Sequence, residues 1–430
     1  MHRFGEYDVL AKLSASGPAA VYLVRKRGAG RFAHVACLKT FRLPNVDGHE
    51  ALEAFVEEAT FATQLRHEGC IRVHDVGTND GISYIAMELV VGETLEDLLR
   101  RARAARTPVP FEVVAGIAAR IADALHYAHN TKDASGARLD VVHRDLAPSN
   151  VMLSYEGAVK VLDFGVARIA DHIATVTGSP AGRPAYMAPE QLQGRPVDHR
   201  ADIFALGVML HEAFANHARY EGIPTHALAL KTYEAPPPIR ALVPELPEPL
   251  ARITERALAS DLRERYADAD ALANDLRGFL AEVSFRDVTD ELSRYLREVY
   301  GHHASRKMQA IQALIAGEED LDTLLRVFGA ARPTKLDFPD FTDPLGLDEA
   351  PVAATVKAPA PAPPPVLDEF DDETLALPIR ERASTVGTRR TAPSPAARTS
   401  RSSAVGIVLA IVFGVGVGVA ISLLLTGRFG

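Results

Sequence analysis

The segment that decides the fold is residues 142–151, which reads Val142-His143-Arg144-Asp145-Leu146-Ala147-Pro148-Ser149-Asn150-Val151. It places an aspartate, Asp145, and an asparagine, Asn150, five residues apart in one loop. The carboxylate of such a pair can accept a hydrogen bond from an attacking hydroxyl. The amide oxygen can ligate a hard metal ion such as Mg²⁺. The spacing therefore favours a catalytic loop that serves both a reacting hydroxyl and a cation.

Two further motifs follow along the chain. Asp163-Phe164-Gly165 comes thirteen residues after Asn150, directly behind the apolar run 159–162, which predicts a strand. An aspartate at a strand end suits a carboxylate ligand for Mg²⁺, which takes oxygen donors and keeps several waters. Tyr186-Met187-Ala188-Pro189-Glu190 then closes the series. One such motif is weak evidence, but all three in this order and spacing rarely arise by chance.

This set of motifs resembles the eukaryotic-like (Hanks-type) protein kinases of bacteria, most closely their serine/threonine members. The resemblance covers about residues 5–282 and implies an α+β, bilobal protein-kinase fold over residues 1–282. We expect an N-terminal lobe, residues 1–90, with a mostly antiparallel sheet and one prominent helix. A mostly helical lobe, residues 91–282, follows, and ATP would bind in the cleft between the lobes.

The resemblance also assigns roles to individual residues. Asp145 would orient the substrate hydroxyl, and Lys39 would orient the α- and β-phosphates of ATP while paired with Glu58. Asn150 and Asp163 would hold the Mg²⁺ ions that bridge the phosphates. The residues expected to contact ATP are Leu13, Ser14, Ser16, Gly17, Val21, Ala36, Lys39, Met87 as gatekeeper, Glu88 and Val90 of the hinge, Asn150 and Asp163.

Two supporting features are implied as well. Asp202, with Gly207, would lie on the helix that supports the catalytic loop. Glu190 and Arg265 match the buried ion pair of the family, and burying either charge alone would be costly, so we expect them to be paired. His143 would be a packing residue of the catalytic loop and not a base.

The glycine-rich loop departs from the family pattern. The three expected glycines fall at Ser14, Ser16 and Ala19, and only Gly17 remains. Serine and alanine add a Cβ where backbone amides approach the phosphates, and Pro18 removes a donor. Weaker ATP binding is therefore expected. The alternative to an active protein kinase is a pseudokinase that acts as a nucleotide-binding scaffold or adaptor. A third possibility is a small-molecule kinase on the same fold.

A second departure affects two neighbouring loops. The lysine usual two residues after the catalytic aspartate is Ala147 here, and the threonine usual after Gly182 is Arg183. One loop has lost a cation and another has gained one. Arg183 would then reach Asp145 or the γ-phosphate in place of the lysine. The alternative is that Arg183 faces solvent or a peptide substrate.

The activation loop carries two threonines, Thr175 and Thr177, which we expect to be autophosphorylated. Arg144, directly before the catalytic aspartate, can pair with a phosphorylated loop residue and order the loop. The alternative is that both threonines are ordinary loop hydroxyls.

The composition excludes several other classes of protein. The chain has 430 residues, 47% hydrophobic and 24% charged, which is ordinary for a globular protein. The net charge of −9 argues against a nucleic-acid partner. The two cysteines, Cys37 and Cys70, indicate reduced thiols and no disulfide framework. Residues 1–8 are polar, so we expect no signal peptide.

The C-terminal third changes character. Residues 283–332 show helical spacing and would pack on the larger lobe or bind a partner. Residues 333–403 are proline-rich and predict a disordered linker. Residues 404–426 carry no charge and, as a helix of about 34 Å, would cross a hydrocarbon core of about 30 Å. A four-residue tail, 427–430, follows.

These features predict a membrane-anchored kinase. Arginines between 380 and 403 precede the apolar segment, so the kinase domain would be cytoplasmic at the inner membrane, and these arginines would attract anionic membrane lipids. Protein substrates are the expected partners. A homodimer would form through the kinase domain or through the Gly414 and Gly418 face of the membrane helix, although glycine is simply common in such helices.

Overall fold

The computed structural model describes residues 2–16, 19–26, 34–41, 62–133, 135–164, 183–218, 237–285, 287–317 and 321–330. Several predictions fall outside these residues: those on Gly17, Glu58 and its helix, Thr175, Thr177, the linker 333–403 and the apolar segment 404–426. In the described part of the chain, no helix has the length and apolar character that crossing a membrane requires.

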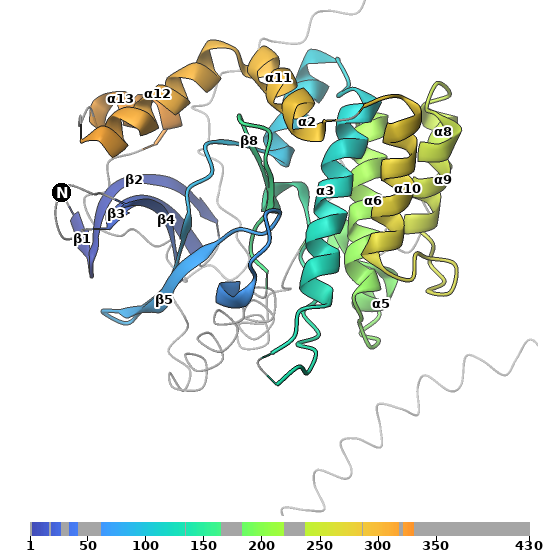
Figure 1. Ribbon diagram of the computed structural model, residues 1–430, viewed down its shortest axis with the longest axis horizontal. Coiled ribbons are helices and arrows are strands. Elements are labelled where there is room, and N and C mark those ends of the chain that lie inside the picture. The colour runs from blue at the N-terminus through green and yellow to red at the C-terminus, as the bar shows by residue number, and fades with distance from the viewer. Residues whose placement is uncertain are drawn as a thin grey trace, which may run out of the picture. The chain divides into compact units, whose positions relative to one another are not determined.

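The N-terminal lobe is a six-stranded antiparallel sheet with the strand order β1-β2-β3-β4-β6-β5 (Figure 1). Side chains alternate between its faces, so Ala36 and Leu38 are buried with Tyr22 on one face, while Cys37 and Phe41 pack on the other. The strands are β1 (His2–Phe4), β2 (Tyr7–Ser16), β3 (Ala19–Lys26), β4 (His34–Phe41), β5 (Val73–Asn79) and β6 (Ile82–Glu88).

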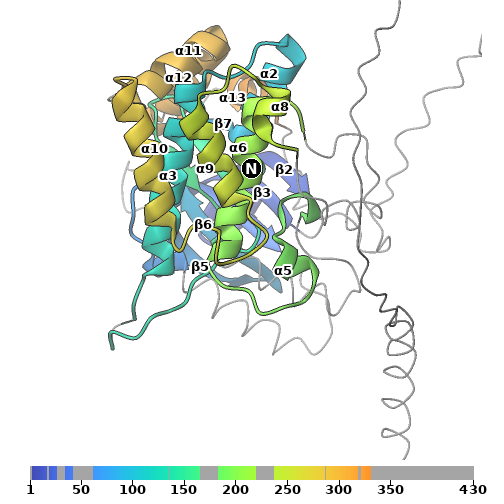
Figure 2. The ribbon, with the colours of Figure 1, turned by 90° about the vertical axis from the view of Figure 1, so that its right-hand side faces the viewer.

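The C-terminal lobe combines a small sheet with a helical body. The sheet order is β7-β8-β9, with β7 at Gly92–Thr94, β8 at Val151–Ser154 and β9 at Val159–Val161. Figure 2 shows α3, α6, α9 and α10 running side by side. The helices are α2 (Leu95–Ala105), α3 (Phe111–His129), α5 (Pro189–Leu192), α6 (Arg200–Ala215), α8 (Ile239–Leu242), α9 (Glu248–Ala257) and α10 (Ala269–Glu282). Short 3-10 helices span Pro148–Asn150 and Pro184–Tyr186.

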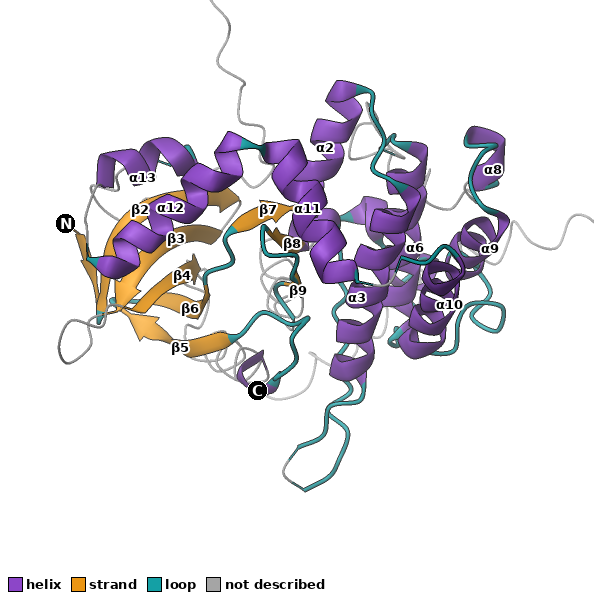
Figure 3. Ribbon diagram, turned by 45° about the horizontal axis from the view of Figure 1, so that its top comes forward, coloured by secondary structure: helices purple, strands orange, loops and turns teal. Residues whose placement is uncertain are grey.

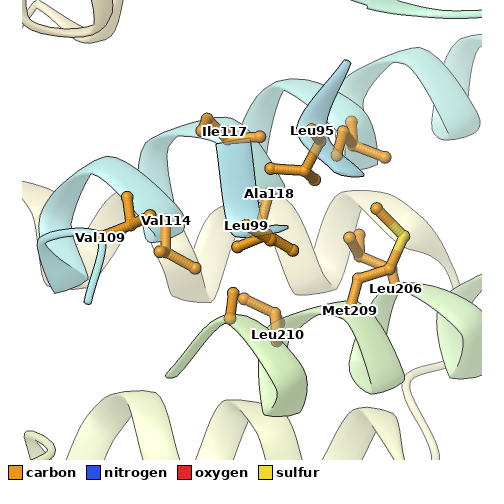
Figure 4. A pocket seen from close by; sticks show the side chains of 11 residues that line it. Leu95, Leu99, Val109, Val114, Ile117, Ala118, Leu206, Met209 and Leu210 are labelled. Carbon is orange, nitrogen blue, oxygen red and sulfur yellow. The ribbon is translucent and has the colours of Figure 1, made fainter. Parts of the chain in front are cut away.

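Helices α3 and α6 form the centre of this lobe, because both are apolar on nearly all sides and are buried along most of their length. Between them and α2 lies an apolar void of only about 20 Å³, lined by side chains such as Leu99, Ile117 and Met209 (Figure 4). This helical body carries the loop that contains Asp145 and Asn150.

Three helices follow the catalytic lobes: α11 (Val288–Tyr300), α12 (His302–Ala316) and α13 (Leu321–Phe328). Helix α11 begins at Asp287, whose side chain accepts hydrogen bonds from two backbone amides of the first turn. It packs on α3, whereas α12 and α13 lie along β2–β4 (Figure 3). Of the two alternatives for this region, packing on the larger lobe or binding a partner, the first holds for α11, and α12 and α13 pack on the N-terminal lobe in addition. Amphipathic spacing shows that one face is buried but does not show against what.

Candidate active site

The catalytic loop is anchored by Asp202, in the first turn of α6. Its carboxylate is 1% exposed and accepts backbone hydrogen bonds from His143 and Arg144, each of 2.8 Å. It also pairs with His129 Nε2 at 2.8 Å. Burial alone would raise the pKa of Asp202, but the hydrogen bonds from His129 and the His143 amide hold it below its ordinary value. The supporting role expected for Asp202 is confirmed.

Asp145 and Asn150 meet in this loop. The amide nitrogen of Asn150 donates to the backbone oxygen of Asp145 at 2.8 Å and to its Oδ2 at 3.2 Å. The amide oxygen of Asn150 is therefore the atom that could ligate a cation. Arg144 has a φ of +62°, in the left-handed region that costs a non-glycine residue energy. The hydrogen bonds to Asp202 hold the loop in this conformation.

Lys39 and Asp163 reach the same place from the two lobes. Lys39 Nζ lies 2.5 Å from Asp163 Oδ2. The amide of Leu162 donates to the backbone oxygen of Asn150 at 2.8 Å, which places the next residue, Asp163, beside the loop that contains Asn150. Asp163 has a φ of +59°, a second strained position within the site. Lysine, aspartates and asparagine thus form one connected group.

The strand register places other expected nucleotide contacts beside this group. Val21 stands opposite Lys39 on the neighbouring strand, and Ser14 stands opposite Val21. Residues directly opposite each other in an antiparallel pair share a face. Val21 and Ser14 therefore lie on the face that carries Lys39, and Leu13 packs with the cluster at one end of the same sheet.

The structure corrects the expectation for Ala36. Ala36 is 1% exposed and packs on the sheet face opposite to Lys39. Cys37, two residues before Lys39, shares the face of Lys39 and clusters with Met87 and Leu162. The strand period of two would have identified Cys37 from the sequence. Burial raises the pKa of the Cys37 thiol to about 12, so the thiol is protonated at neutral pH.

The hinge follows β6 and joins the lobes. Glu88, the last residue of β6, pairs through its carboxylate with Lys160 at 2.8 Å and accepts a hydrogen bond from the Arg72 amide at 2.9 Å. Val90 clusters with Met87 on the nucleotide face of the sheet. The Glu88 side chain is thus held by both lobes.

Arg183 contacts the carboxylate of Asp145. Its Nη1 lies 2.9 Å from Asp145 Oδ2, with the two side chains 42% and 26% exposed. Arg183 was expected either to reach Asp145 or the γ-phosphate, or to face solvent or a peptide substrate, and the contact favours the first alternative. Gln191, which the sequence reasoning missed, joins the same segments: its amide nitrogen donates to the Arg144 backbone at 3.0 Å, and its oxygen accepts from the Ala188 amide.

The expected ion pair of Glu190 and Arg265 is present. Arg265 Nη1 lies 2.7 Å from Glu190 Oε1, and both side chains are at most 1% exposed. Arg265 also donates to the backbone oxygens of Arg200 and Ala259 at 2.9 Å, so its remaining donors are not left unpaired. The pair fixes the segment that ends the activation loop to the helical body.

Comparison with known proteins agrees with this geometry. The model of the protein kinase domain family matches residues 7–276. The Myxococcus xanthus protein named tyrosine-protein kinase MasK is 36% identical over 332 residues, covering 76% of this chain and 50% of that protein. The Bacillus subtilis serine/threonine-protein kinase PrkC is 30% identical over 275 residues, covering 64% of this chain and 40% of that protein. The chain thus spans half or less of the length of these curated relatives.

A solved structure is similar as well. A double mutant of the Mycobacterium tuberculosis PknI kinase domain superposes with a TM-score of 0.51 at 28% sequence identity. The match covers 64% of this chain and 96% of the PknI chain. The range matched by the protein kinase domain family, residues 7–276, contains the residues described above.

Proposed function

The chain belongs to the protein kinase family, and on that premise we propose that it is an active kinase that transfers the γ-phosphoryl group of ATP to serine or threonine hydroxyls of proteins. The observation that carries the proposal is the connected group of Lys39, Asp145, Asn150 and Asp163, drawn from both lobes. Retention of these groups weighs more than the altered glycine loop, because they provide most of the transition-state electrostatics.

The residues would divide the work as follows. Asp145, held by Asn150 and Arg183, would accept a hydrogen bond from the acceptor hydroxyl. As the hydroxyl oxygen bonds to the γ-phosphorus and the bond to ADP breaks, the hydroxyl proton would pass to the Asp145 carboxylate. Lys39 would place its charge beside the ATP phosphates. Positioning and charge neutralisation are the main catalytic contributions in phosphoryl transfer.

The donor set fits the divalent cation that the family uses, which we propose to be Mg²⁺. Asp163 offers a carboxylate and Asn150 an amide oxygen, both hard oxygen ligands. The described residues contain no cluster of three or more histidines, cysteines or carboxylates suited to a metal. Phosphate oxygens and water would complete the coordination. When bound, the cation supplies neutralisation of the phosphate charge.

Arg183 is proposed to replace the cation that Ala147 does not provide. The arginine lies on the atom of Asp145 that also accepts from Asn150. Two donors on Oδ2 restrict rotation of the carboxylate and leave Oδ1 for the acceptor hydroxyl. The arginine would also place positive charge next to the reacting phosphoryl group.

Activation-loop autophosphorylation at Thr175 or Thr177 is a further part of the proposal. Within the described residues, Arg144 Nε is buried and has no hydrogen-bond partner. A buried guanidinium nitrogen without a partner is costly, and a phosphate is a preferred ligand for arginine. A phosphorylated threonine of the loop would satisfy Arg144 and order the loop.

Tyrosine is the second candidate acceptor. MasK, named as a tyrosine kinase, is 36% identical to this chain, whereas PrkC is 30% identical. The chain also lacks the lysine and threonine typical of serine/threonine kinases, at Ala147 and Arg183. The identity of the phosphorylated residue separates the two candidates.

Anchoring to the membrane completes the proposal. The uncharged segment 404–426 and the arginines that precede it support a single membrane helix with the kinase domain in the cytoplasm. Attachment to one surface would raise the effective concentration of kinase domains for one another. Association through the Gly414 and Gly418 face would strengthen that effect.

The test is phosphoamino-acid analysis of the full chain after incubation with γ-labelled ATP and Mg²⁺. The proposal expects labelled phosphothreonine or phosphoserine in the wild type and none in Asp145→Asn. Labelled phosphotyrosine that is lost in Asp145→Asn would establish the second candidate. Absence of label in the wild type would contradict the proposal and favour a pseudokinase that acts as a nucleotide-binding scaffold.

A further inference from the structure

Helices α11, α12 and α13, residues 288–300, 302–316 and 321–328, will together be called the strap. Seven residues, Leu10, Ala11, Leu23 and Val35 of the sheet and Ile311, Leu314 and Leu324 of the strap, form one buried apolar cluster. Leu13, expected to contact ATP, and the hinge residues Leu89 and Val91 pack against the same cluster. The strap is therefore continuous with the wall of the nucleotide site.

The other end of the strap is fixed to the C-terminal lobe. Leu292 and Leu296 of α11 are buried in the main core, and Val288 contacts the position of Gly116 on α3 so closely that a Cβ there would lie 3.0 Å away. At Gly157, in the turn after β8, a Cβ would come within 1.9 Å of the Thr289 backbone oxygen. The absence of a side chain at both glycines lets α11 approach. The strap thus joins the two lobes on the outer side of the hinge.

A polar network ties the strap to the chain directly after the hinge. Lys307 of α12 is 8% exposed, and its Nζ lies 2.7 Å from Glu93 Oε1 and 3.4 Å from the Gly92 backbone oxygen. The hydroxyl of Tyr155 donates to the same Glu93 oxygen, and His303 Nε2 lies 3.3 Å from it. Glu93 thus joins α12 to β7, the strand that continues from the hinge.

The strap also binds the turn after β8, the strand that pairs with β7. The Tyr155 backbone oxygen accepts from Ser293 Oγ at 2.9 Å and from Arg297 Nε at 3.1 Å, both on α11. The Tyr155 amide in turn donates to the Val91 backbone oxygen at 3.1 Å. A chain of hydrogen bonds therefore runs from α11 to the hinge backbone.

Lys307 occupies a core position of its helix. Tyr300, Ala304, Ile311 and Leu314 recur at spacings that put them on one buried face, and Lys307 falls between Ala304 and Ile311 on that face. Lysine is rarely buried unless it is paired. A buried cation at this position is explained by its contact with Glu93 and not by packing alone.

We propose that the strap is a positioning element of the ATP site, with Lys307 as its positioning residue for the hinge. The proposal rests on the proposed function only in taking the cleft as the nucleotide site. By fixing residues 89–93 from outside, the strap would hold the hinge in the conformation that binds the nucleotide, so less ordering is needed on binding. Lys307 would act on nucleotide affinity and not on the transfer step, because it contacts none of the catalytic residues described above.

The test compares Lys307→Met with Arg306→Met in the full chain. Arg306 lies on the same helix and is exposed, so its variant removes a cation without touching the network. The Kd for ADP with Mg²⁺ is measured by calorimetry, and KM for ATP and kcat by steady-state transfer. The proposal predicts a rise of about tenfold in Kd and KM for Lys307→Met, equivalent to about 1.4 kcal/mol of binding free energy, with kcat at saturating ATP nearly unchanged. Arg306→Met should match the wild type.

Two additional variants keep the test decisive if Lys307→Met does not fold. Lys307→Arg retains the charge and should bind ADP within about threefold of the wild type. Leu314→Ala weakens the apolar contact without removing a charge and should raise the Kd for ADP. Wild-type affinity in folded Lys307→Met, or in Leu314→Ala, would overturn the proposal.

The outcome is separable from that of the proposed function. If the wild type transfers no phosphate but Lys307→Met still weakens ADP binding, the strap proposal stands and the kinase activity fails. If the wild type transfers phosphate and Lys307→Met binds ADP normally, only the strap proposal fails. A wild type that binds no ADP would overturn both.

Discussion

Replacing Arg183 tests whether a relocated cation supports catalysis. The variant Arg183→Thr restores the residue typical of serine/threonine kinases but leaves Asp145 without the cation that lies 2.9 Å from its Oδ2. The double variant Arg183→Thr/Ala147→Lys moves the charge to the position where the family carries it. Ala147 is 1% exposed, so the new lysine depends on the space that the arginine leaves.

The expected magnitude follows from the exposure of the pair. With side chains 42% and 26% exposed, the ion pair stabilises the free enzyme by only about 0.2–1 kcal/mol. Bound substrates exclude water in the transition state, where a charge-assisted hydrogen bond contributes about 1.5–3 kcal/mol. The value of kcat should therefore fall by about 10- to 100-fold in Arg183→Thr, while the free energy of unfolding hardly changes.

The assay is the initial rate of transfer from γ-labelled ATP to casein at saturating ATP, with Arg195→Thr as the control for loss of an exposed arginine from the same region. The double variant should recover at least part of the lost rate. A kcat for Arg183→Thr within about twofold of the wild type would refute the replacement, because such a change is less than about 0.5 kcal/mol.

Three further predictions concern the supporting structure. Asp202→Asn should lower the melting temperature at neutral pH, and the difference in melting temperature from the wild type should shrink as the pH falls below about 4. The reason is that a carboxylate with a lowered pKa stabilises the fold above its ordinary pKa and loses that contribution when it is protonated. A difference in melting temperature that stays constant from about pH 7 to below about pH 4 would contradict this. Glu190→Ala should lower the free energy of unfolding in urea by about 3–5 kcal/mol, because it leaves Arg265 charged and buried, and a loss of under about 1 kcal/mol would be inconsistent with the pair. Cys37 should react slowly with iodoacetamide at pH values near the ordinary thiol pKa of about 8.5, because its own pKa is raised to about 12. Equal rates of alkylation in the folded and the urea-unfolded protein, measured by mass spectrometry, would contradict the raised pKa.

The catalytic loop was predictable because its chemistry demands particular residue types at fixed spacing. Asp145, Asn150 and Asp163 are suggested by the groups that a hydroxyl and a cation require. Asp202 was assigned through the resemblance to the family alone, and the structure supplies the reason, since its carboxylate accepts hydrogen bonds from two backbone amides of the loop. The burial of Glu190 and Arg265 was implied by the resemblance, and their pairing followed from the cost of an unpaired buried charge. Residue types at fixed spacing carry the first set of inferences, and the family resemblance carries the rest.

The errors arise where tertiary placement decides. Ala36 was assigned to the nucleotide face, although counting by two from Lys39 selects Cys37. Residues 283–332 were expected to pack on the larger lobe or to bind a partner, because an amphipathic pattern does not identify the surface that covers it. Lys307, a lysine at a core position of a helix, indicates a buried partner but does not name Glu93.

The most direct test of the account compares phosphate transfer with nucleotide binding in the wild type and in Asp145→Asn. Asp145 is assigned to the acceptor hydroxyl and not to the nucleotide. The account therefore predicts that both proteins bind ADP with Mg²⁺ with similar affinity in calorimetry, and that only the wild type transfers label from ATP to protein. Equal transfer by both proteins, or nucleotide binding by a wild type that transfers no label, would contradict it.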